Sequence, residues 1–197
     1  MLTEPIVPRI DIAAAILAGG KSSRMGSNKA NLPYCKERLI DHMARLPTAL
    51  GCSPIVVSWH VEGYHSIEDQ MPHAGPLGGI HAVTQAVLRE SWPRAWLFVP
   101  VDMPLLTPEL LNRLSSCSYD YDGACFENRP LPLFLRLHAH VFSAIDQAAA
   151  KIAGGEKMAV HQLLAQLHLR TVRCSEQEVV QLANANTPEE WERITAA

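Results

Sequence analysis

A glycine-rich loop with cationic residues follows the first apolar stretch of the chain, in the order LAGGKSSRMGSNK over residues 17–29. Adjacent Gly19 and Gly20 allow backbone N–H groups to approach an anion closely, and Arg24 and Lys29 add positive charge. The spacing matches neither a Walker A loop nor the GxGxxG dinucleotide fingerprint. We therefore predict a phosphate-binding loop of another kind; the alternative is a surface turn with solvated basic side chains.

A single carboxylate, Asp102, follows the continuous apolar run at residues 96–101. Open parallel sheets bind ligands beyond the carboxyl ends of their strands. Mg2+ prefers one or two carboxylates together with phosphate oxygens and water. Asp102 is therefore a candidate magnesium ligand, and the alternative is an aspartate that caps the turn after the strand.

A second group of small residues, Gly75-Pro76-Leu77-Gly78-Gly79, opens a predicted helix. Small residues at a helix N-terminus suit the approach of a nucleotide or another anion. Asp69 precedes this segment and could accept hydrogen bonds from a base or a ribose. The alternative is a tight loop beside a solvated aspartate.

These candidate residues lie between alternating strands and helices. Apolar runs predict strands at residues 11–17, 55–59, 96–101, 121–126, 131–137 and 168–172. Helical spacing predicts helices at residues 39–50, 79–88, 108–114, 141–152, 158–167 and 188–194, with Thr107 and Thr187 as N-caps. This order predicts an α/β fold of three layers, with a mostly parallel sheet and helices on both faces.

The composition excludes several classes of protein. The chain has 197 residues, of which 48% are hydrophobic, so we expect one folded domain over residues 1–197 rather than disorder. A net charge of -3 lacks the basic footprint of a nucleic-acid binder. The apolar run at residues 12–18 is too short to span a membrane. Five scattered cysteines without a CxxC favour reduced thiols and a cytoplasmic location.

Four motifs in this order resemble the molybdenum cofactor guanylyltransferase family: LAGGKSSRMGSNK, the Asp69 segment leading to GPLGG, VDMP, and NANTPEE at residues 184–190. The resemblance implies a Rossmann-type fold like that of the nucleotide-diphospho-sugar transferases. It also implies transfer of GMP from GTP to the terminal phosphate of molybdopterin, with release of pyrophosphate. Mg2+ is the implied cofactor, and GTP and molybdopterin are the implied substrates.

The resemblance assigns roles to individual positions. The implied catalytic residues are Arg24, Lys29 and Asp102, with Asp102 also the metal ligand. The implied nucleotide-binding residues are Leu17, Ala18, Gly19, Gly20, Lys29, Ser58, Asp69, Gly78 and Asp102. Pro132, Asn184 and Asn186 are expected on the side of the molybdopterin.

Two positions depart from the family pattern. Asn28 precedes Lys29 where members often have aspartate. Ser58 stands where the family can place asparagine, and a hydroxyl offers fewer hydrogen-bonding sites than an amide. A contact between residue 58 and the base is therefore the least secure of the carried-over roles.

No catalytic histidine is expected. The attacking phosphate is already anionic, so positioning and charge neutralisation carry the implied reaction. His138 and His140 lie close together in the sequence without a third metal ligand, and we expect them to be solvated or capping residues. Guanine would need acceptors, which the carbonyls of residues 17–19 and the Asp69 carboxylate could supply. Gly19→Ala is expected to crowd that pocket.

Two other functions remain open. The first is another nucleotidyl transfer by the same fold, above all transfer of CMP to molybdopterin. The cytidylyl relatives, however, usually have LAAG in place of LAGG and tend to have aspartate where this chain has Asn186. A non-catalytic nucleotide-binding protein is the second, and the presence of Lys29 and Asp102 favours catalysis instead. We expect a monomer that contacts neither membrane nor nucleic acid; transient contact with molybdoenzymes or their chaperones is compatible with the resemblance.

Overall fold

The computed structural model describes residues 11–19, 29–71 and 74–195. The predicted site residues Gly20 and Arg24 lie outside these ranges. A seven-stranded sheet has the order β5-β4-β1-β6-β8-β7-β9. Its strands are β1 (Ile12–Leu17), β4 (Ile55–Val57), β5 (His65–Ser66), β6 (Ala95–Pro100), β7 (Gly123–Phe126), β8 (Arg129–Arg136) and β9 (Leu169–Val172).

One strand runs against all the others in this sheet. β8 pairs antiparallel with β6 and with β7, whereas the remaining neighbours pair parallel. Phe126 at the end of β7 pairs with Arg129 at the start of β8, so only two residues turn the chain. The second of them, Asn128, has a φ of 57°, a conformation that asparagine adopts more readily than most residues. This turn brings the beginning of β8 to the edge where the parallel strands end.

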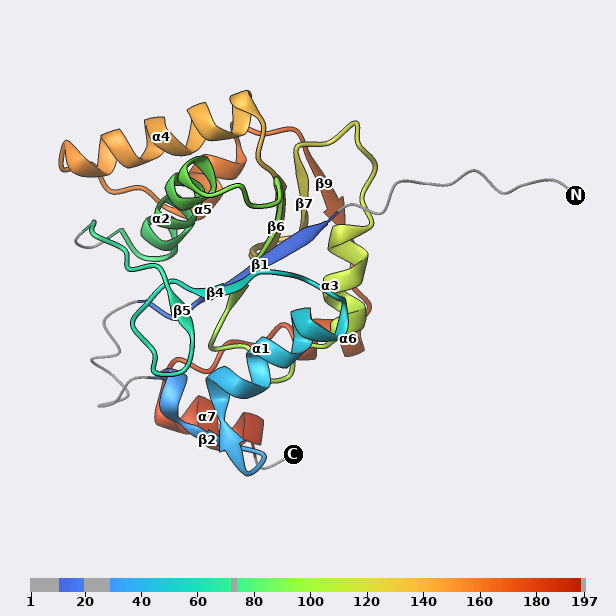
Figure 1. Cartoon of the computed structure of the whole chain (residues 1–197). Helices are drawn as coiled ribbons and strands as arrows, with labels where there is room; N and C mark the ends of the chain where they lie inside the picture. The colour runs from blue at the N-terminus through green and yellow to red at the C-terminus, as the bar shows by residue number, and fades with distance from the viewer. Residues whose placement is uncertain (1–10, 20–28, 72–73, 196–197) are drawn as a thin grey trace, which may run out of the picture.

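Helices cover both faces of the sheet, which confirms the predicted three-layer α/β fold (Figure 1). α2 (Pro76–Arg89), α4 (Ala139–Ala153) and α5 (Val160–Leu164) pack on one face. α1 (Leu39–Ala49) and α3 (Pro108–Ser115) pack on the other, beside α6 (Glu176–Gln181) and α7 (Pro188–Thr195) (Figure 1). The short helix η1 (Lys29–Asn31) and the hairpin β2 (Pro33–Tyr34) and β3 (Glu37–Arg38) precede α1.

The side chains of β1 show why the sheet has two apolar faces. Ala13, Ala15 and Leu17 belong to the core beneath α2 and α4. Ala14 and Ile16 belong to the core beneath α1 and α3. Successive side chains of a strand point to opposite faces, so an uninterrupted apolar run such as IAAAIL is buried on both sides.

The main strands and helices were predicted within a few residues, and some elements were not. α2 begins at Pro76, before the predicted residue 79, and α5 ends at Leu164, before the predicted residue 167. The sequence analysis did not predict η1, β2, β3, β5 or α6. Thr107 caps α3 as predicted, because its hydroxyl accepts a hydrogen bond from Leu110 N–H.

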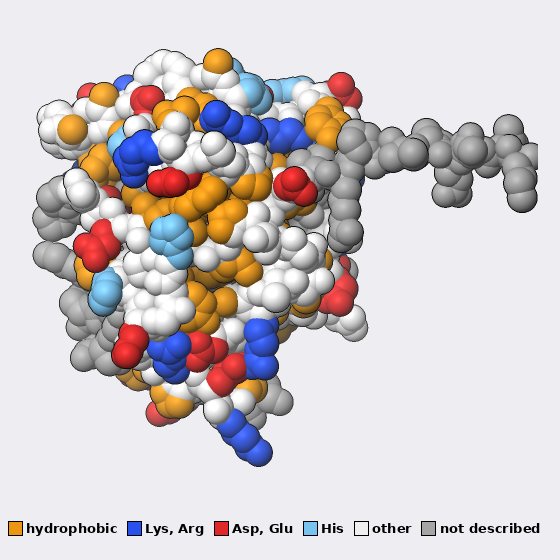
Figure 2. Space-filling view, in the orientation of Figure 1, with side chains coloured by type: hydrophobic (Ala, Val, Ile, Leu, Met, Phe, Trp, Pro, Cys, Tyr) orange, Lys and Arg blue, Asp and Glu red, His pale blue; other side chains and the backbone are white. Residues whose placement is uncertain are grey.

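The described surface is mixed in charge on the face seen in Figure 2. Basic and acidic side chains are interspersed there, and the basic ones form several separate groups. Within the described ranges, no helix combines the length and the apolar character that a membrane span requires.

Candidate functional site

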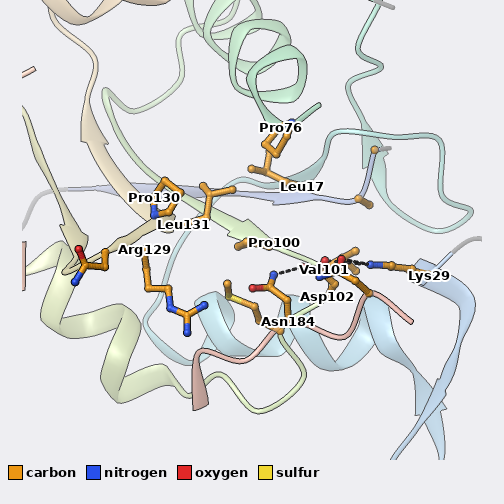
Figure 3. A pocket seen from close by; sticks show the side chains of 15 residues that line it. Leu17, Lys29, Pro76, Pro100, Val101, Asp102, Arg129, Pro130, Leu131 and Asn184 are labelled. Atoms are coloured by element: carbon orange, nitrogen blue, oxygen red, sulfur yellow. Dashed lines mark hydrogen bonds and ion pairs between the residues drawn. The ribbon is translucent and has the colours of Figure 1, made fainter. Parts of the chain in front are cut away.

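A cavity of about 410 Å3 opens at the edge where β1 and β6 end (Figure 3). This volume lies in the range of small-molecule sites. Two segments distant in sequence from these strands complete the wall: the β7–β8 turn and the stretch before α7. Its lining residues are Leu17, Ala18, Gly19, Lys29, Pro76, Pro100, Val101, Asp102, Met103, Asn128, Arg129, Pro130, Leu131, Asn184 and Asn186.

Four polar side chains form one hydrogen-bonded group at this cavity, which we call the carboxyl-edge cluster: Lys29, Asp102, Asn184 and Asn186. Lys29 Nζ lies 3.1 Å from Asp102 Oδ2 and donates a 2.9 Å hydrogen bond to Asn186 Oδ1. Asn184 Nδ2 donates to Asp102 Oδ1 at 3.0 Å. Residues that the sequence analysis placed in separate motifs therefore meet at one point.

The NANTPEE segment owes its position to the cap of α7. Thr187 Oγ1 accepts from Glu190 N–H at 3.2 Å, and Glu190 Oε2 accepts from the N–H groups of Asn186 and Thr187. This reciprocal pattern is a capping box. Ala185 is buried, and its N–H donates to the carbonyl of Asp102 at 2.8 Å. The side chains of Asn184 and Asn186 are thereby held against Asp102 and Lys29.

The first strand ends in a backbone that contacts its neighbours on two sides. The carbonyl of Leu17 accepts from Val101 N–H at 3.1 Å, next to Asp102. The N–H of Ala18 donates to Ser58 Oγ at 3.2 Å. Ser58 is 2% exposed and is absent from the cavity wall, and its hydroxyl holds the backbone at the end of β1. The nucleotide contact expected at residue 58 stays a prediction.

Asp69 and the start of α2 lie together. A Cβ atom built on Gly78 would overlap the carboxyl group of Asp69, so only glycine allows this aspartate its present position. Asp69 Oδ1 also accepts from Met71 N–H at 2.7 Å. Neither Asp69 nor Gly78 lines the cavity, although Pro76 from the same helix start does. The two predicted residues are thus adjacent to each other and to the edge of the site.

Gly19 has room for a methyl group beside its described protein neighbours. A Cβ at this position would lie 3.4 Å from the carbonyl oxygen of Ser58 and 3.6 Å from the Trp59 ring. These are ordinary van der Waals distances, so a methyl group at residue 19 would not have to displace these neighbours. The expected crowding concerns the bound base, so it stays a prediction about the nucleotide and not about Ser58 or Trp59.

On the far side of the cavity the structure shifts the expected contact along the chain. Pro132 is buried within β8 and does not line the cavity. The residues that do are its predecessors Asn128, Arg129, Pro130 and Leu131. The sequence provided no signal for Arg129, because the strand was expected to begin at residue 131 and the turn before it was not predicted.

The donor set of the carboxyl-edge cluster fits Mg2+. Asp102 supplies one carboxylate, and Asn186 supplies an amide oxygen that accepts from Lys29. Asn184 turns its Nδ2 toward Asp102 and so orients the carboxylate. A magnesium ion that also binds phosphate oxygens and water needs no more than this from the protein. Among the described residues, no group of three or more His, Cys, Asp or Glu side chains is arranged to hold a metal by itself.

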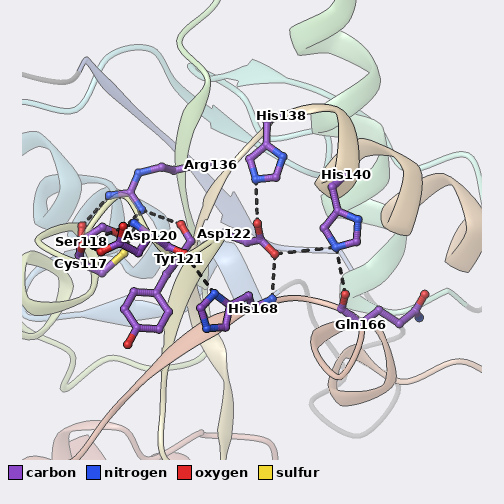
Figure 4. Close-up of polar contacts among 10 residues, drawn as sticks. All are labelled: Cys117, Ser118, Asp120, Tyr121, Asp122, Arg136, His138, His140, Gln166 and His168. Carbon is purple, nitrogen blue, oxygen red and sulfur yellow. Dashed lines mark hydrogen bonds and ion pairs between the residues drawn. The ribbon is translucent and has the colours of Figure 1, made fainter.

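His138 and His140 lie in a second polar group at the opposite ends of the strands, together with Asp122 and His168 (Figure 4). Asp122 Oδ1 is 2.8 Å from His138 Nε2, and its Oδ2 accepts from the backbone N–H of His168 at 2.8 Å. His140 Nε2 is 3.9 Å from the same carboxylate. We call these four residues the amino-edge cluster. All three of its histidines are exposed, and this agrees with the solvated or capping role expected for His138 and His140.

Comparison with known proteins identifies the family of the chain. Residues 14–172 match the family described as MobA-like NTP transferase domain. A molybdenum cofactor guanylyltransferase from Xanthomonas euvesicatoria pv. vesicatoria is 38% identical over 91% of this chain and 92% of its own. Another from Photobacterium profundum is 31% identical over 91% of this chain and 93% of its own.

Solved structures share the fold at lower identity. The molybdopterin-guanine dinucleotide biosynthesis protein A from Archaeoglobus fulgidus aligns with a TM-score of 0.70 and 21% identity, over 93% of this chain and 97% of its own. The 2-C-methyl-D-erythritol 4-phosphate cytidylyltransferase from Thermus thermophilus aligns with a TM-score of 0.62 and 13% identity, over 95% and 98%. From its site and these relatives, the chain belongs to the molybdenum cofactor guanylyltransferase family of MobA-like NTP transferases and is a nucleotidyltransferase.

Proposed function

We propose that this chain, acting as a single nucleotidyltransferase domain in the cytoplasm, transfers GMP from GTP to the terminal phosphate of molybdopterin. The observation that carries the proposal is the carboxyl-edge cluster, in which Lys29 and Asp102 meet beside the Leu17–Gly19 backbone at the cavity. A cation, a carboxylate and a strand end at one cavity are what a nucleoside triphosphate with its metal requires.

The reaction needs no protein nucleophile. A phosphate oxygen of molybdopterin forms a bond to the α-phosphorus of GTP, and the bond from that phosphorus to the oxygen bridging the β-phosphorus breaks. Pyrophosphate leaves with the electron pair of the broken bond. The protein must hold two polyanions in line and neutralise their charge.

Lys29 and Asp102 divide that task. Asp102 would hold Mg2+ with the amide oxygen of Asn186 beside it, and the ion when bound supplies charge neutralisation to the triphosphate. Lys29 is 14% exposed and already faces the cavity, so a short movement of its ammonium from Asp102 would bring it to the phosphates. Arg24 is proposed as a second phosphate-binding cation from the preceding loop.

Recognition of guanine rests on acceptors near the end of β1. The carbonyl of Leu17 already accepts from Val101 N–H, whereas no described residue donates to the carbonyls of Ala18 and Gly19, so these two are the proposed acceptors. Asp69 Oδ1 accepts from Met71 N–H, and no hydrogen bond from a described residue reaches its Oδ2. Guanine donates through N1–H and its amino group, whereas cytosine presents acceptors at N3 and O2, so such a site favours guanine.

The test is product analysis with the purified chain, Mg2+, molybdopterin and equimolar GTP and CTP. We expect the guanine dinucleotide to dominate and one pyrophosphate to appear for each dinucleotide formed. Predominant cytosine dinucleotide would overturn the choice of base and leave nucleotidyl transfer in place. Absence of any dinucleotide, with GTP still bound in calorimetry, would favour the non-catalytic alternative.

A further inference from the structure

We infer that Arg129 is the residue that binds the acceptor's terminal phosphate, which places a second anion site at the β7–β8 turn. The inference rests on the proposed function and adds a position for the second substrate. Arg129 is the first residue of β8 and lines the cavity (Figure 3).

No described residue neutralises the charge of Arg129. Among the described residues that line the cavity, the basic side chains are Lys29 and Arg129. Lys29 is paired with Asp102, whereas the guanidinium of Arg129 makes no hydrogen bond or ion pair with a described residue. Its charge acts on Cys174, but burial raises the pKa of that thiol, so Cys174 does not supply a compensating negative charge. A half-buried cation at a cavity that has no partner among the described residues is suited to an anionic ligand.

Arg129 also stands on a separate wall from the donor's groups. Lys29 and Asp102 approach from η1 and the end of β6, while Arg129 comes from the turn before β8 (Figure 3). The backbone of this turn fixes the position of the residue, because Phe126 and Arg129 pair directly and Asn128 has a positive φ. Two cationic groups on different walls of one cavity allow two phosphate-bearing substrates to meet with their charges separately compensated.

A guanidinium binds a phosphomonoester through two parallel hydrogen bonds. A thiol or a pterin ring does not offer the same pair of anionic oxygen acceptors. The phosphate of the acceptor is therefore the chemical group that Arg129 should distinguish. A charged hydrogen bond of this kind corresponds to roughly a ten- to hundredfold change in affinity.

The experiment measures four affinities: those of wild-type protein and of the variant, each for a pterin with and without its terminal phosphate. Molybdopterin and its phosphatase-treated form are titrated by pterin fluorescence into wild-type protein and into Arg129→Ala. We expect Arg129→Ala to weaken binding of molybdopterin about ten- to hundredfold and to leave binding of the dephosphorylated form unchanged. Arg129→Lys should recover part of the loss, and Arg89→Ala, an exposed arginine in the last turn of α2, should match wild type.

Two results would overturn the inference. Equal losses for both pterins would show that Arg129 does not read the phosphate. A comparable loss of GTP affinity in Arg129→Ala would assign the residue to the donor instead. The proposed function is separable: it fails if wild type binds both substrates and forms no guanine dinucleotide, whereas the Arg129 inference fails alone if the dinucleotide forms and Arg129→Ala keeps the wild-type KM for molybdopterin.

Discussion

The two ends of the sheet each carry a polar cluster, and the clusters are built in different ways. At the carboxyl edge, Lys29, Asp102, Asn184 and Asn186 bond one another through their side chains beside a cavity. At the amino edge, the Asp122 carboxylate accepts from the backbone N–H of His168 as well as lying beside His138 (Figure 4).

This difference indicates that the carboxyl-edge cluster is a ligand site, whereas the amino-edge cluster stabilises the fold. Nearby Arg136 donates to the carbonyl oxygens of Cys117, Ser118 and Tyr121, so this end of the molecule uses side chains to satisfy the backbone. Within the described ranges, the carboxyl-edge side chains hydrogen-bond only to one another, so they can change partners when a ligand arrives. Loss of one cluster should therefore affect activity, and loss of the other should affect stability.

The largest effect is expected from Asp102→Ala. It removes the proposed metal ligand, and turnover should fall by about a hundredfold or more. The backbone carbonyl of Asp102 still accepts from Ala185 N–H, so the melting temperature should stay close to wild type. Steady-state kinetics and thermal unfolding measure the two quantities. Near-wild-type turnover would remove Asp102 from the mechanism.

Lys29→Ala should have a smaller effect that depends on the ligand. Since Lys29 is assigned to the phosphates, GTP affinity should fall roughly ten- to hundredfold and GMP affinity much less. Calorimetry with both nucleotides in the presence of Mg2+ makes the comparison. Equal losses would show that the lysine acts away from the β- and γ-phosphates.

Asp122→Ala should lower stability and leave activity unchanged, which is the reverse of the effect expected for Asp102→Ala. Removing a buried carboxylate leaves the N–H of His168 unpaired, which costs about 1–3 kcal/mol of unfolding free energy. The KM for GTP should be unchanged because Asp122 lies at the other end of the strands. Asp120→Ala, at an exposed carboxylate two residues earlier, is the control and should unfold like wild type. A kinetic defect without loss of stability would contradict the division between the clusters.

Two glycines sharpen the comparison within the carboxyl edge. Gly78→Ala would push its methyl group into Asp69 and should cost about 1–3 kcal/mol together with a severalfold loss of GTP affinity. A methyl group from Gly19→Ala would make ordinary contacts with the described neighbours Ser58 and Trp59, and stability should change by about 0.5 kcal/mol or less. In an Asp69→Ala background, Gly78→Ala should add almost no further cost. A full additional loss would mean that Asp69 is not what the methyl group meets.

The sequence predicted those parts of the fold in which one local signal dominates. The apolar run predicted strand β6, Thr107 was predicted to cap α3, and the structure confirms both. The reversed direction of β8 was not predicted, because apolar periodicity is the same for a parallel and an antiparallel strand. α6 was missed although Ser175 and Glu178 form a capping box, since its six residues bury no side chain and so show no apolar stripe.

The site was predictable where the motif contains the chemistry. Lys29, Asp102, Asn184 and Asn186 were identified from motif resemblance, and the structure brings them together at one cavity. Arg129 was not identified as a site residue, because its importance comes from the geometry of a turn and from a missing partner. The hairpin of β2 and β3 was also missed, since Cys35 and Lys36 both adopt positive φ without being residues that favour it.

The capping box of α7 has a consequence for how the protein comes into being. Asn186 bonds Lys29 across 157 positions of sequence, so this contact can form only after the Thr187–Glu190 segment has left the ribosome and begun its helix. Contacts between such distant residues are slow to form, since a long loop must close first. A nascent chain can therefore pair β1 with β6 and still lack two of the four carboxyl-edge side chains, which makes activity one of the last properties the chain acquires during its synthesis.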